Sequence, residues 1–357
     1  EFRRVLFRSL MNISRDQIID SLYKIMCTST TTAIDNKVSN NDYFKRRVLG
    51  FKAEIEFEEE LKKSDFSFLK GGILLSPRLD GSKDMKNKFA YITIDSLHQN
   101  QYLGIYSGIS TWDEIEILYY AKINLEDWRE ENYEVKENKG EKLVNKKILV
   151  PSFKLFKFDR NSNSFKESFE NNFSDILKIG NKRTKKSSKF HLRKREHFDY
   201  FKNYDLETLK KIYAERYFLD KKKNEDVIVN TIDLDGFITK KEKTFIVEIK
   251  EKTPIKPKNI ESMSNKQFWS YGWDTRRILW YSEVQKKTGF EIFYIVRQIE
   301  NRKDRKFVQW DGISLNDYLK GISWSNSTGG GGGGDTLTVP YNHFLSLQKL
   351  LDKTYLL

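Results

Sequence analysis

The chain contains one cysteine, Cys27, and only four histidines among its 357 residues. A single cysteine cannot form an internal disulfide, and these residues are too few for an ordinary structural zinc site. The sequence also has no run of 18 or more apolar residues, so no segment is predicted to span a bilayer. We therefore expect a cytoplasmic protein with a reduced thiol and no membrane partner.

Acidic residues are also scarce relative to basic ones. The chain has 64 Lys and Arg against 51 Asp and Glu, a formal net charge of +13. This excess indicates a polyanionic partner, such as nucleic acid. With 38% hydrophobic and 14% aromatic residues, the chain is too apolar to be disordered, and its length favours two domains.

The first ten residues, EFRRVLFRSL, lack the apolar core that a secretory signal requires. The run RRVLFRS also looks like the translation of a common sequencing adapter. We expect residues 1–10 to be non-native, with Met11 as the true start. We further predict an N-terminal α+β domain over residues 11–176, a basic linker or arm over 177–204, and a second domain over 205–357.

A tract between residues 178 and 195 carries nine basic residues and no acidic one. It is either a solvated basic surface or an arm that follows the phosphates of a nucleic acid. The second interpretation predicts nucleic-acid contacts from Lys182, Arg183, Lys185, Lys186, Arg193 and Lys194.

The segment TIDLDGFITKKEKTFIVEIKEK, residues 231–252, predicts a hairpin of two strands. Strand side chains alternate between faces, so Glu248 and Lys250 share one face of the second strand. Asp233 and Asp235 have the same parity on the first strand. Two or three carboxylates and one ammonium group are therefore expected to converge on one face of the sheet.

Clustered carboxylates repel one another and stay ionised only when a cation joins them, and Mg²⁺ prefers such oxygen ligands. An ion held by Asp235 and Glu248 could polarise a phosphodiester and activate water, while Lys250 positions the nucleophile. We expect Mg²⁺, with Mn²⁺ able to substitute. Asp233 is the alternative ligand; Gly236 favours Asp235 because it allows a close approach. A simple surface ion-pair cluster is the other interpretation.

Asp235 followed by Glu248-Ile249-Lys250 resembles the D…(D/E)xK signature of the PD-(D/E)xK nuclease superfamily, which includes type II restriction endonucleases and RecB-type nucleases. The segment from Gln267 to Tyr271, QFWSY, resembles the QhxxY motif of RecB-type members. The resemblance covers roughly residues 205–300. It implies an α/β, restriction-endonuclease-like core with a mixed central sheet flanked by helices, beside a separate N-terminal α+β domain. Its implied catalytic residues are Asp235, Glu248, Lys250, Gln267 and Tyr271.

Two helices are expected to flank the hairpin. The first, over residues 205–217, could supply Glu215 as a further metal ligand, as the resemblance implies, although a surface pair with Arg216 or Lys211 is the alternative. The second, over about residues 265–287, would carry Gln267 and Tyr271 on one face. Its Arg276 and Arg277 could bind phosphate bidentately or form surface ion pairs.

The resulting prediction is a Mg²⁺-dependent DNA nuclease, most simply a restriction-type endonuclease that reads bases with its N-terminal domain. Such enzymes commonly dimerise, so the resemblance also raises a homodimer as an expectation. One alternative is a defence or repair nuclease acting on single-stranded DNA or RNA, and another is a non-catalytic nucleic-acid-binding protein. The glycine run at 329–334 is expected to be a flexible loop, because no Lys follows it as in a phosphate-binding loop.

Overall fold

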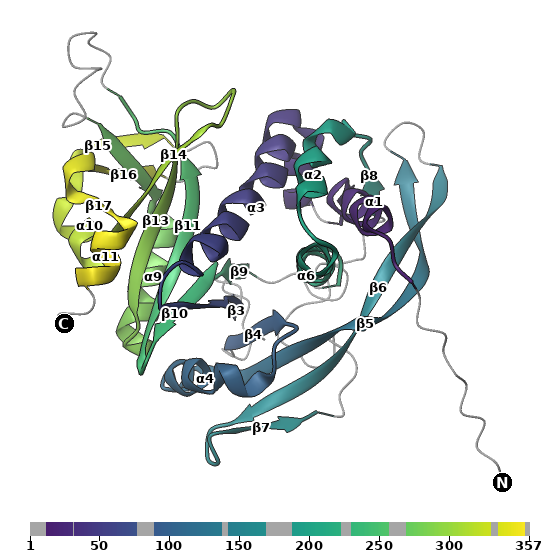
Figure 1. Cartoon of the computed structure of the whole chain (residues 1–357), viewed down its shortest axis with the longest axis horizontal. Helices are drawn as coiled ribbons and strands as arrows, with labels where there is room; N and C mark the ends of the chain where they lie inside the picture. Colours follow the sequence, from purple (N-terminus) through teal and green to yellow (C-terminus); the bar gives the residue numbers. More distant parts are fainter. Residues whose placement is uncertain are drawn as a thin grey trace, which may run out of the picture. The chain divides into compact units, whose positions relative to one another are not determined.

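The computed structural model of this chain describes residues 12–30, 32–76, 89–137, 142–168, 188–222, 230–256, 269–329 and 335–353. The predicted adapter segment, Gln267, nearly all of the glycine run and four of the basic residues predicted to bind nucleic acid lie outside these ranges. Those four are Lys182, Arg183, Lys185 and Lys186. Helices and strands mix along the chain, which is a mixed α/β protein as predicted (Figure 1).

The chain forms two compact units that interleave in sequence. One comprises Glu1–Leu49, Ile73–Leu103 and Glu114–Thr231, and the other Gly50–Gly72, Gly104–Asp113 and Ile232–Leu357. The predicted division between 176 and 205 therefore does not coincide with the units. The reason lies in strand pairing, because β2 (Ser67–Lys70) adds to the hairpin strand β10 (Gly236–Lys240) and brings its segment into the second unit.

The first unit is built on a large sheet with a long antiparallel hairpin (Figure 1). The strand order is β1-β8-β5-β4-β3-β9, with β6 and β7 branching from β5. The bounds are β1 Thr28–Ser29, β3 Gly72–Ser76, β4 Phe89–Asp95, β5 Ile115–Glu137, β6 Leu143–Asp159, β7 Ser164–Glu167, β8 Lys189–Phe190 and β9 Asn230–Asp233. The apolar runs from Ile115 to Ala121 and from Lys147 to Phe158 predict two strands there, and β5 and β6 both extend beyond these bounds.

Helices of this unit begin where their capping residues predict. The side chain of Ser14 accepts a hydrogen bond from the backbone at the start of α1 (Arg15–Met26), and Asp205 does the same for α6 (Leu206–Arg216). Two predictions from the local sequence are wrong. The polar stretch from Thr28 to Asn41 predicts a loop but contains α2 (Thr32–Ser39), and the apolar run from Tyr102 to Tyr106 predicts a strand but is helical.

The second error has a simple cause. The segment belongs to a 3-10 turn, η1 (Gln99–Tyr102), and to α4 (Leu103–Ser110). In α4 the buried residues are Ile105, Tyr106 and Ile109, which is helical spacing. So short an apolar run does not distinguish a strand from a buried helix by periodicity alone.

The second unit has a six-stranded mixed sheet ordered β17-β14-β13-β11-β10-β2. Strands β11 and β13 run parallel, and the other pairs are antiparallel. Its remaining strands are β11 Lys243–Lys252, β13 Glu291–Ile299, β14 Phe307–Ser314 and β17 Leu345–Ser346. Apolar residues from α3 (Asn41–Leu61) pack on one face of this sheet against Val247, Ile249 and Trp310.

A second sheet of this unit corrects the predicted helix over 265–287. Its order is β12-β16-β15, with bounds Ser270–Asp274, Asp335–Pro340 and Ser323–Gly329. The helix α9 (Thr275–Thr288) begins only after Asp274, whose side chain caps it, and ends at Gly289 with φ 74°. Tyr271 and Trp273 instead alternate in a strand paired with β16.

The short C-terminal helices of the unit are α10 (Leu315–Gly321) and α11 (Leu347–Lys353). Leu347, Leu350 and Leu351 of α11 join the core on the α3 face of the sheet. None of the helices in the described part of the chain combines the length and the hydropathy needed to cross a membrane.

Candidate active site

The predicted hairpin forms, and it brings the three central side chains together. Strands β10 and β11 pair in the register Gly236↔Val247. Because side chains alternate, Val247 and Ile249 face the α3 core, and Glu248 and Lys250 lie on the opposite face. Glu248 is fully buried, while the Lys250 side chain is 34% exposed. The sheet therefore presents one deeply held acid beside a partly accessible amine.

Asp235 reaches the same point from a break in the first strand. The chain leaves β9 after Asp233 and begins β10 at Gly236, and Asp235 lies in the gap. Its Oδ2 accepts hydrogen bonds from the backbone N–H of Ile249 at 2.7 Å and from Lys250 Nζ at 3.0 Å. Lys250 Nζ is also 2.8 Å from Glu248 Oε1. One ammonium group thus bridges two carboxylates.

Gly236 makes room for the ring of Phe68, which differs from the role expected from the sequence. A Cβ at this position would lie 2.3 Å from the ring of Phe68 on β2. The glycine therefore permits close packing of the neighbouring strand, and it does not by itself distinguish Asp235 from Asp233 as a ligand.

The two acids respond differently to burial. Burial and the nearby charge of Glu248 raise the pKa of Asp235, and Lys250 and Arg277 offset this only in part. Burial also acts to raise the pKa of Glu248, but Lys250 and Arg277 outweigh it and hold that pKa below its usual range. Asp235 is consequently the carboxylate that most needs a further cation.

Helix α9 supplies two residues that hold Glu248. Tyr281 Oη donates a hydrogen bond to Glu248 Oε2 at 2.5 Å, and Arg277 Nη1 lies 3.3 Å from the same oxygen. Arg277 also donates to the backbone carbonyl of Asp233 at 3.0 Å. Since the two residues are four apart on one helix, a single helix face fixes the acid. Arg277 was predicted to contact phosphate, and Tyr281 was missed by the sequence analysis.

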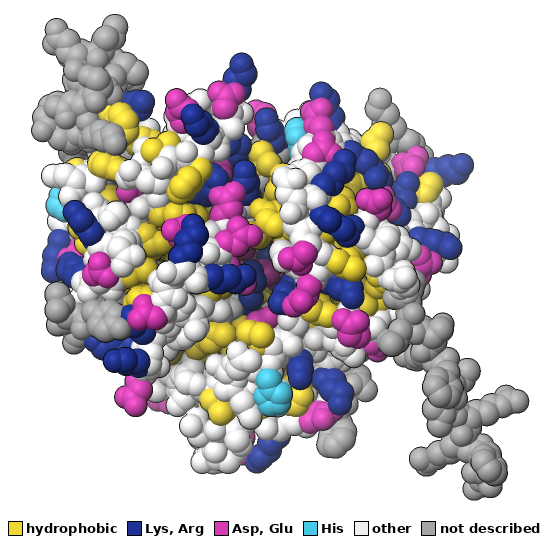
Figure 2. Space-filling model, in the orientation of Figure 1, with side chains coloured by type: hydrophobic (Ala, Val, Ile, Leu, Met, Phe, Trp, Pro, Cys, Tyr) yellow, Lys and Arg dark blue, Asp and Glu magenta, His cyan; other side chains and the backbone are white. Residues whose placement is uncertain are grey.

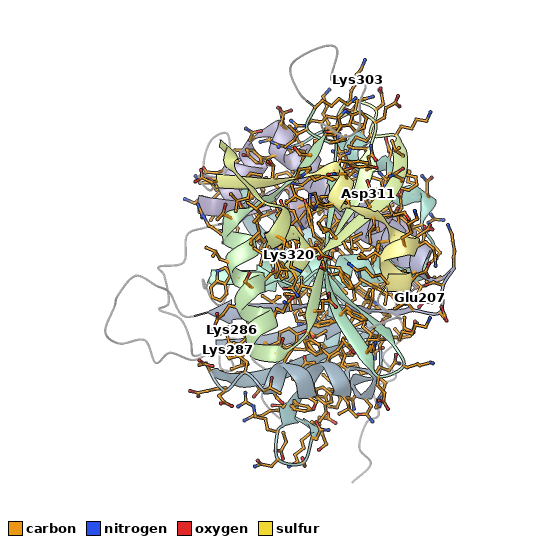
Figure 3. All side chains as sticks on the ribbon, turned by 90° about the vertical axis from the view of Figure 1, so that its left-hand side faces the viewer. Glu207, Lys286, Lys287, Lys303, Asp311 and Lys320 are labelled. Carbon is orange, nitrogen blue, oxygen red and sulfur yellow. The ribbon has the colours of Figure 1, made fainter. Side chains whose placement is uncertain are left out.

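The predicted QhxxY residues do not form this helix face. Gln267 lies outside the described residues, and Tyr271 is in β12. The buried Tyr271 hydroxyl donates to Asp311 Oδ2 at 3.0 Å, in a network with Gln309 and Tyr341. Asp311, which is labelled in Figure 3, lies on β14 of the second unit. Arg277 and Tyr281 therefore occupy the helical i, i+4 positions that the motif predicted for Gln267 and Tyr271.

Three other acidic residues, Glu54, Asp233 and Glu215, differ in whether they act on the pair Asp235 and Glu248. Glu54 of α3 contributes to the raised pKa of Asp235, so its charge is felt at the centre. Asp233 has a buried Oδ1 with no hydrogen-bond partner among the described residues. Glu215, predicted as an extra ligand, belongs to the first unit and pairs with Arg216 at 2.7 Å, which was the alternative interpretation. The sequence analysis did not identify Glu54.

Two described residues of the basic tract are already engaged. The Arg193 guanidinium donates to the backbone carbonyls of Val38 and Ser39 at the end of α2, at 2.7 and 2.6 Å, and to Asn41. It therefore anchors a helix end. Lys194 is exposed and pairs with Glu196 at 3.6 Å. On the face drawn in Figure 2, the basic side chains of the described residues are interspersed with acidic ones.

The residues present suit a hard divalent ion. Within the described ranges, no group of three or more His, Cys, Asp or Glu side chains is arranged to hold a metal. Mg²⁺ does not need such a cage, because it commonly binds one or two carboxylates together with water and substrate phosphate. The pair Asp235 and Glu248 meets that requirement. The raised pKa of Asp235 is the property that an added cation would relieve.

No protein-family model, curated protein or solved structure matches this chain. The inference of function therefore depends on the geometry of the site.

The Tyr281→Phe variant tests whether α9 positions Glu248. Removing this hydroxyl takes away the shorter of two contacts to Glu248 Oε2 and leaves the one from Arg277. Losing a supporting hydrogen bond of this kind typically costs about 10–100-fold in metal affinity or activity. We expect the Mg²⁺ concentration for half-maximal cleavage to rise. Tyr318→Phe is the matched control, because it removes another buried hydroxyl whose hydrogen-bond partners among the described residues are backbone carbonyls. Equal effects of both variants would contradict a specific role for Tyr281.

Proposed function

We propose that this chain is a Mg²⁺-dependent nuclease that hydrolyses DNA phosphodiester bonds, with a restriction-endonuclease-like core of the PD-(D/E)xK superfamily. The observation that carries the proposal is the meeting of Asp235, Glu248 and Lys250 at one point of the hairpin. The parallel pair β11 and β13, connected through α9, supports the same core.

Each residue has a distinct task in this proposal. Asp235 and Glu248 would hold the metal, which when bound polarises the phosphodiester and lowers the pKa of its water. The backbone N–H of Ile249 keeps Asp235 in place, and α9 keeps Glu248 in place. Lys250 orients the attacking water and offsets negative charge that develops on phosphorus.

Nucleic acid is the substrate class that the charge favours. The net charge of +13 supports attraction to a polyanion. A sequence-specific endonuclease needs a surface that reads bases as well as one that cuts. The first unit, with its long hairpin of β5 and β6, is available for that task, and we propose a type II restriction-like endonuclease on this basis.

The decisive experiment incubates the purified protein with closed circular plasmid, single-stranded DNA and RNA, each with Mg²⁺, Mn²⁺ or EDTA. We expect cleavage of DNA with either metal and none with EDTA. Opening of the circle identifies an endonuclease. Lys250→Met should abolish cleavage, whereas Lys286→Ala on the exposed last turn of α9 should cleave like the wild type. Metal-independent cleavage, or no cleavage of any substrate, would refute the proposal.

A further inference from the structure

Strand β11 carries a second lysine on the face of the candidate site. Lys252 follows Lys250 by two residues, so both side chains leave the same face of the strand. The Lys252 ammonium donates a hydrogen bond to the backbone carbonyl of Gly272 and lies 5.9 Å from the ring centroid of Tyr294. It forms no ion pair with any residue that the structure describes. Among the described residues, Lys252 is thus an amine of the site that no carboxylate contacts directly.

This lysine is in an unfavourable position for a cation. Burial lowers the pKa of Lys252 to about 8. The positive charges of Lys250 and Arg302 add to the effect, and the negative charges of Glu248 and Asp274 offset it only in part. A buried charge is stabilised mainly by an opposite charge, and among the described residues the hydrogen-bond partner of Lys252 is the backbone carbonyl of Gly272. Two residues along a strand span roughly 6.6 Å. A second phosphate of a bound strand, next to the phosphate being cut, would meet the need for an anion.

Beyond Lys252, the chain brings a cation and an aromatic ring together. The backbones of Ile255 and Ser270 exchange hydrogen bonds of 2.8 and 3.0 Å, which places Lys256 opposite Trp269. Lys256 Nζ lies 4.5 Å from the Trp269 ring centroid. The lysine is exposed, and the tryptophan is half-buried and packs edge-on against Tyr341. An aromatic ring beside a surface cation is typical of single-strand binding sites.

We propose that the substrate strand leaves the catalytic centre along the extension of β11 as a single strand. Lys252 contacts the phosphate next to the scissile one, and Trp269 stacks an unpaired base whose phosphate Lys256 neutralises. Bases in a duplex are stacked and paired with their neighbours, so only an unpaired base can offer its face to Trp269. This inference rests on the proposed function for the position of the scissile phosphate, and it requires an unpaired segment next to the cleaved bond in the DNA that the nuclease cuts.

The test measures binding in EDTA, so that it does not depend on cleavage. Fluorescence anisotropy gives the Kd of a labelled single-stranded DNA, an RNA of the same sequence and a DNA duplex over a range of salt concentrations. The variants are Lys252→Met, Lys252→Arg, Lys256→Ala and Trp269→Ala. Lys286→Ala is the matched control, because it removes a lysine that lies away from the end of β11. Figure 3 shows Lys286 at the end of α9, far from Lys303, which lies on the turn that follows β13. The parallel pairing places the end of β11 beside the end of β13.

We expect the salt dependence of single-strand binding to weaken by about 0.7 in slope for Lys252→Met and for Lys256→Ala, one phosphate contact each. Lys252→Arg should retain the slope, because arginine keeps the positive charge that contacts the phosphate. If Lys252 served only to hold β12 through its hydrogen bond to Gly272, the slope would not follow the charge at this position. Trp269→Ala should weaken single-strand binding roughly five-fold or more and leave duplex binding nearly unchanged. The control variant should match the wild type. Equal losses on DNA and RNA indicate recognition of unpaired bases irrespective of the sugar, whereas a larger loss on one identifies the preferred strand.

Two results would overturn the inference. One is an unchanged slope and Kd for Lys252→Met and Trp269→Ala, with thermal unfolding showing that both variants are folded. The other is an equal loss of duplex and single-strand binding in Trp269→Ala. These outcomes can be distinguished from a failure of the proposed function. If the variants bind normally and Mg²⁺-dependent cleavage is active, only the single-strand path is wrong. If the variants lose binding as expected but the protein cleaves no substrate, only the proposed nuclease activity is wrong.

Discussion

Asp235→Asn is expected to abolish Mg²⁺-dependent cleavage and at the same time to make the protein more stable in EDTA. The loss of activity should be about 10³-fold or more, because the neutral asparagine amide would bind the metal less well and the bound metal contributes several kcal/mol of transition-state stabilisation. The gain in stability follows from the raised pKa of this buried carboxyl. Asparagine can still accept the hydrogen bond from Ile249 without carrying a charge next to Glu248.

The size of this stabilisation depends on pH. Above about pH 4 the unfolded chain ionises Asp235 freely, while the folded chain resists ionisation up to its own higher pKa. The carboxyl therefore lowers the free energy of unfolding progressively as the pH rises through this window. We expect wild type and Asp235→Asn to be similar near pH 4, and the variant to be more stable at neutral pH by about 1 kcal/mol or more, roughly 2–4 °C in Tm.

Glu248→Gln is the matched comparison, since it should also abolish cleavage but should destabilise the protein. The pKa of Glu248 is lowered, so its charge stabilises the folded state above its unfolded pKa, and this contribution is lost as the pH falls through the folded pKa. Thermal unfolding in EDTA between pH 4 and 8 measures both variants. The electrostatic description of the site is wrong if the two substitutions change Tm in the same direction at pH 7.

The hairpin and its side-chain convergence could be predicted because they depend on local properties. Period-two alternation and a charged turn were enough to place Glu248 and Lys250 on one face, and the structure has them there. The break between β9 and β10 at Leu234 and Asp235 was not predicted. It depends on the pairing of β10 with β2, a strand far away in sequence.

The helix that holds Glu248 shows what sequence patterns cannot settle. Residues 270–274 satisfy a helical spacing and a strand alternation equally well. Pairing with β16, more than 60 residues later, decides for the strand. Once Asp274 is recognised as an N-cap, the helix starts at Thr275 and the pair Arg277 and Tyr281 becomes visible. The N-cap Asp274 was therefore the sequence signal that was missed. The effect of Glu54 on the pKa of Asp235 could not be predicted, because it depends on the tertiary fold.

A buried ion network on the other face of β11 connects this strand to α3. Arg297 of β13 is 2% exposed, and its guanidinium lies 2.5 Å from Glu56 Oε2 and 2.9 Å from Glu251 Oε2. Arg305 also pairs with Glu251. Burial raises the pKa of Glu251 even with these arginines nearby. The charge of Glu251 is therefore tolerated because Arg305 and Arg297 both lie beside it.

Arg297→Met is expected to lower the free energy of unfolding by about 3–5 kcal/mol, because it leaves buried carboxylates without their shared partner. The deficit should be small near pH 4, where Glu251 is protonated in the folded and the unfolded chain, and should grow as the pH rises, since the remaining acid resists ionisation. Urea unfolding at pH 4 and pH 7 gives both values.

The triple variant Arg297→Met, Glu56→Gln, Glu251→Gln should recover much of this loss at pH 7, because it removes the unpaired charges together with the arginine. Recovery would show that the ion network adds little net stability. Its main role would then be to fix the orientation of α3, and with it the position of Glu54. If the triple variant is as unstable as Arg297→Met, the loss comes from the packing of the Arg297 side chain against Phe307, which its guanidinium overlies at 5.0 Å, and the charges are not its cause.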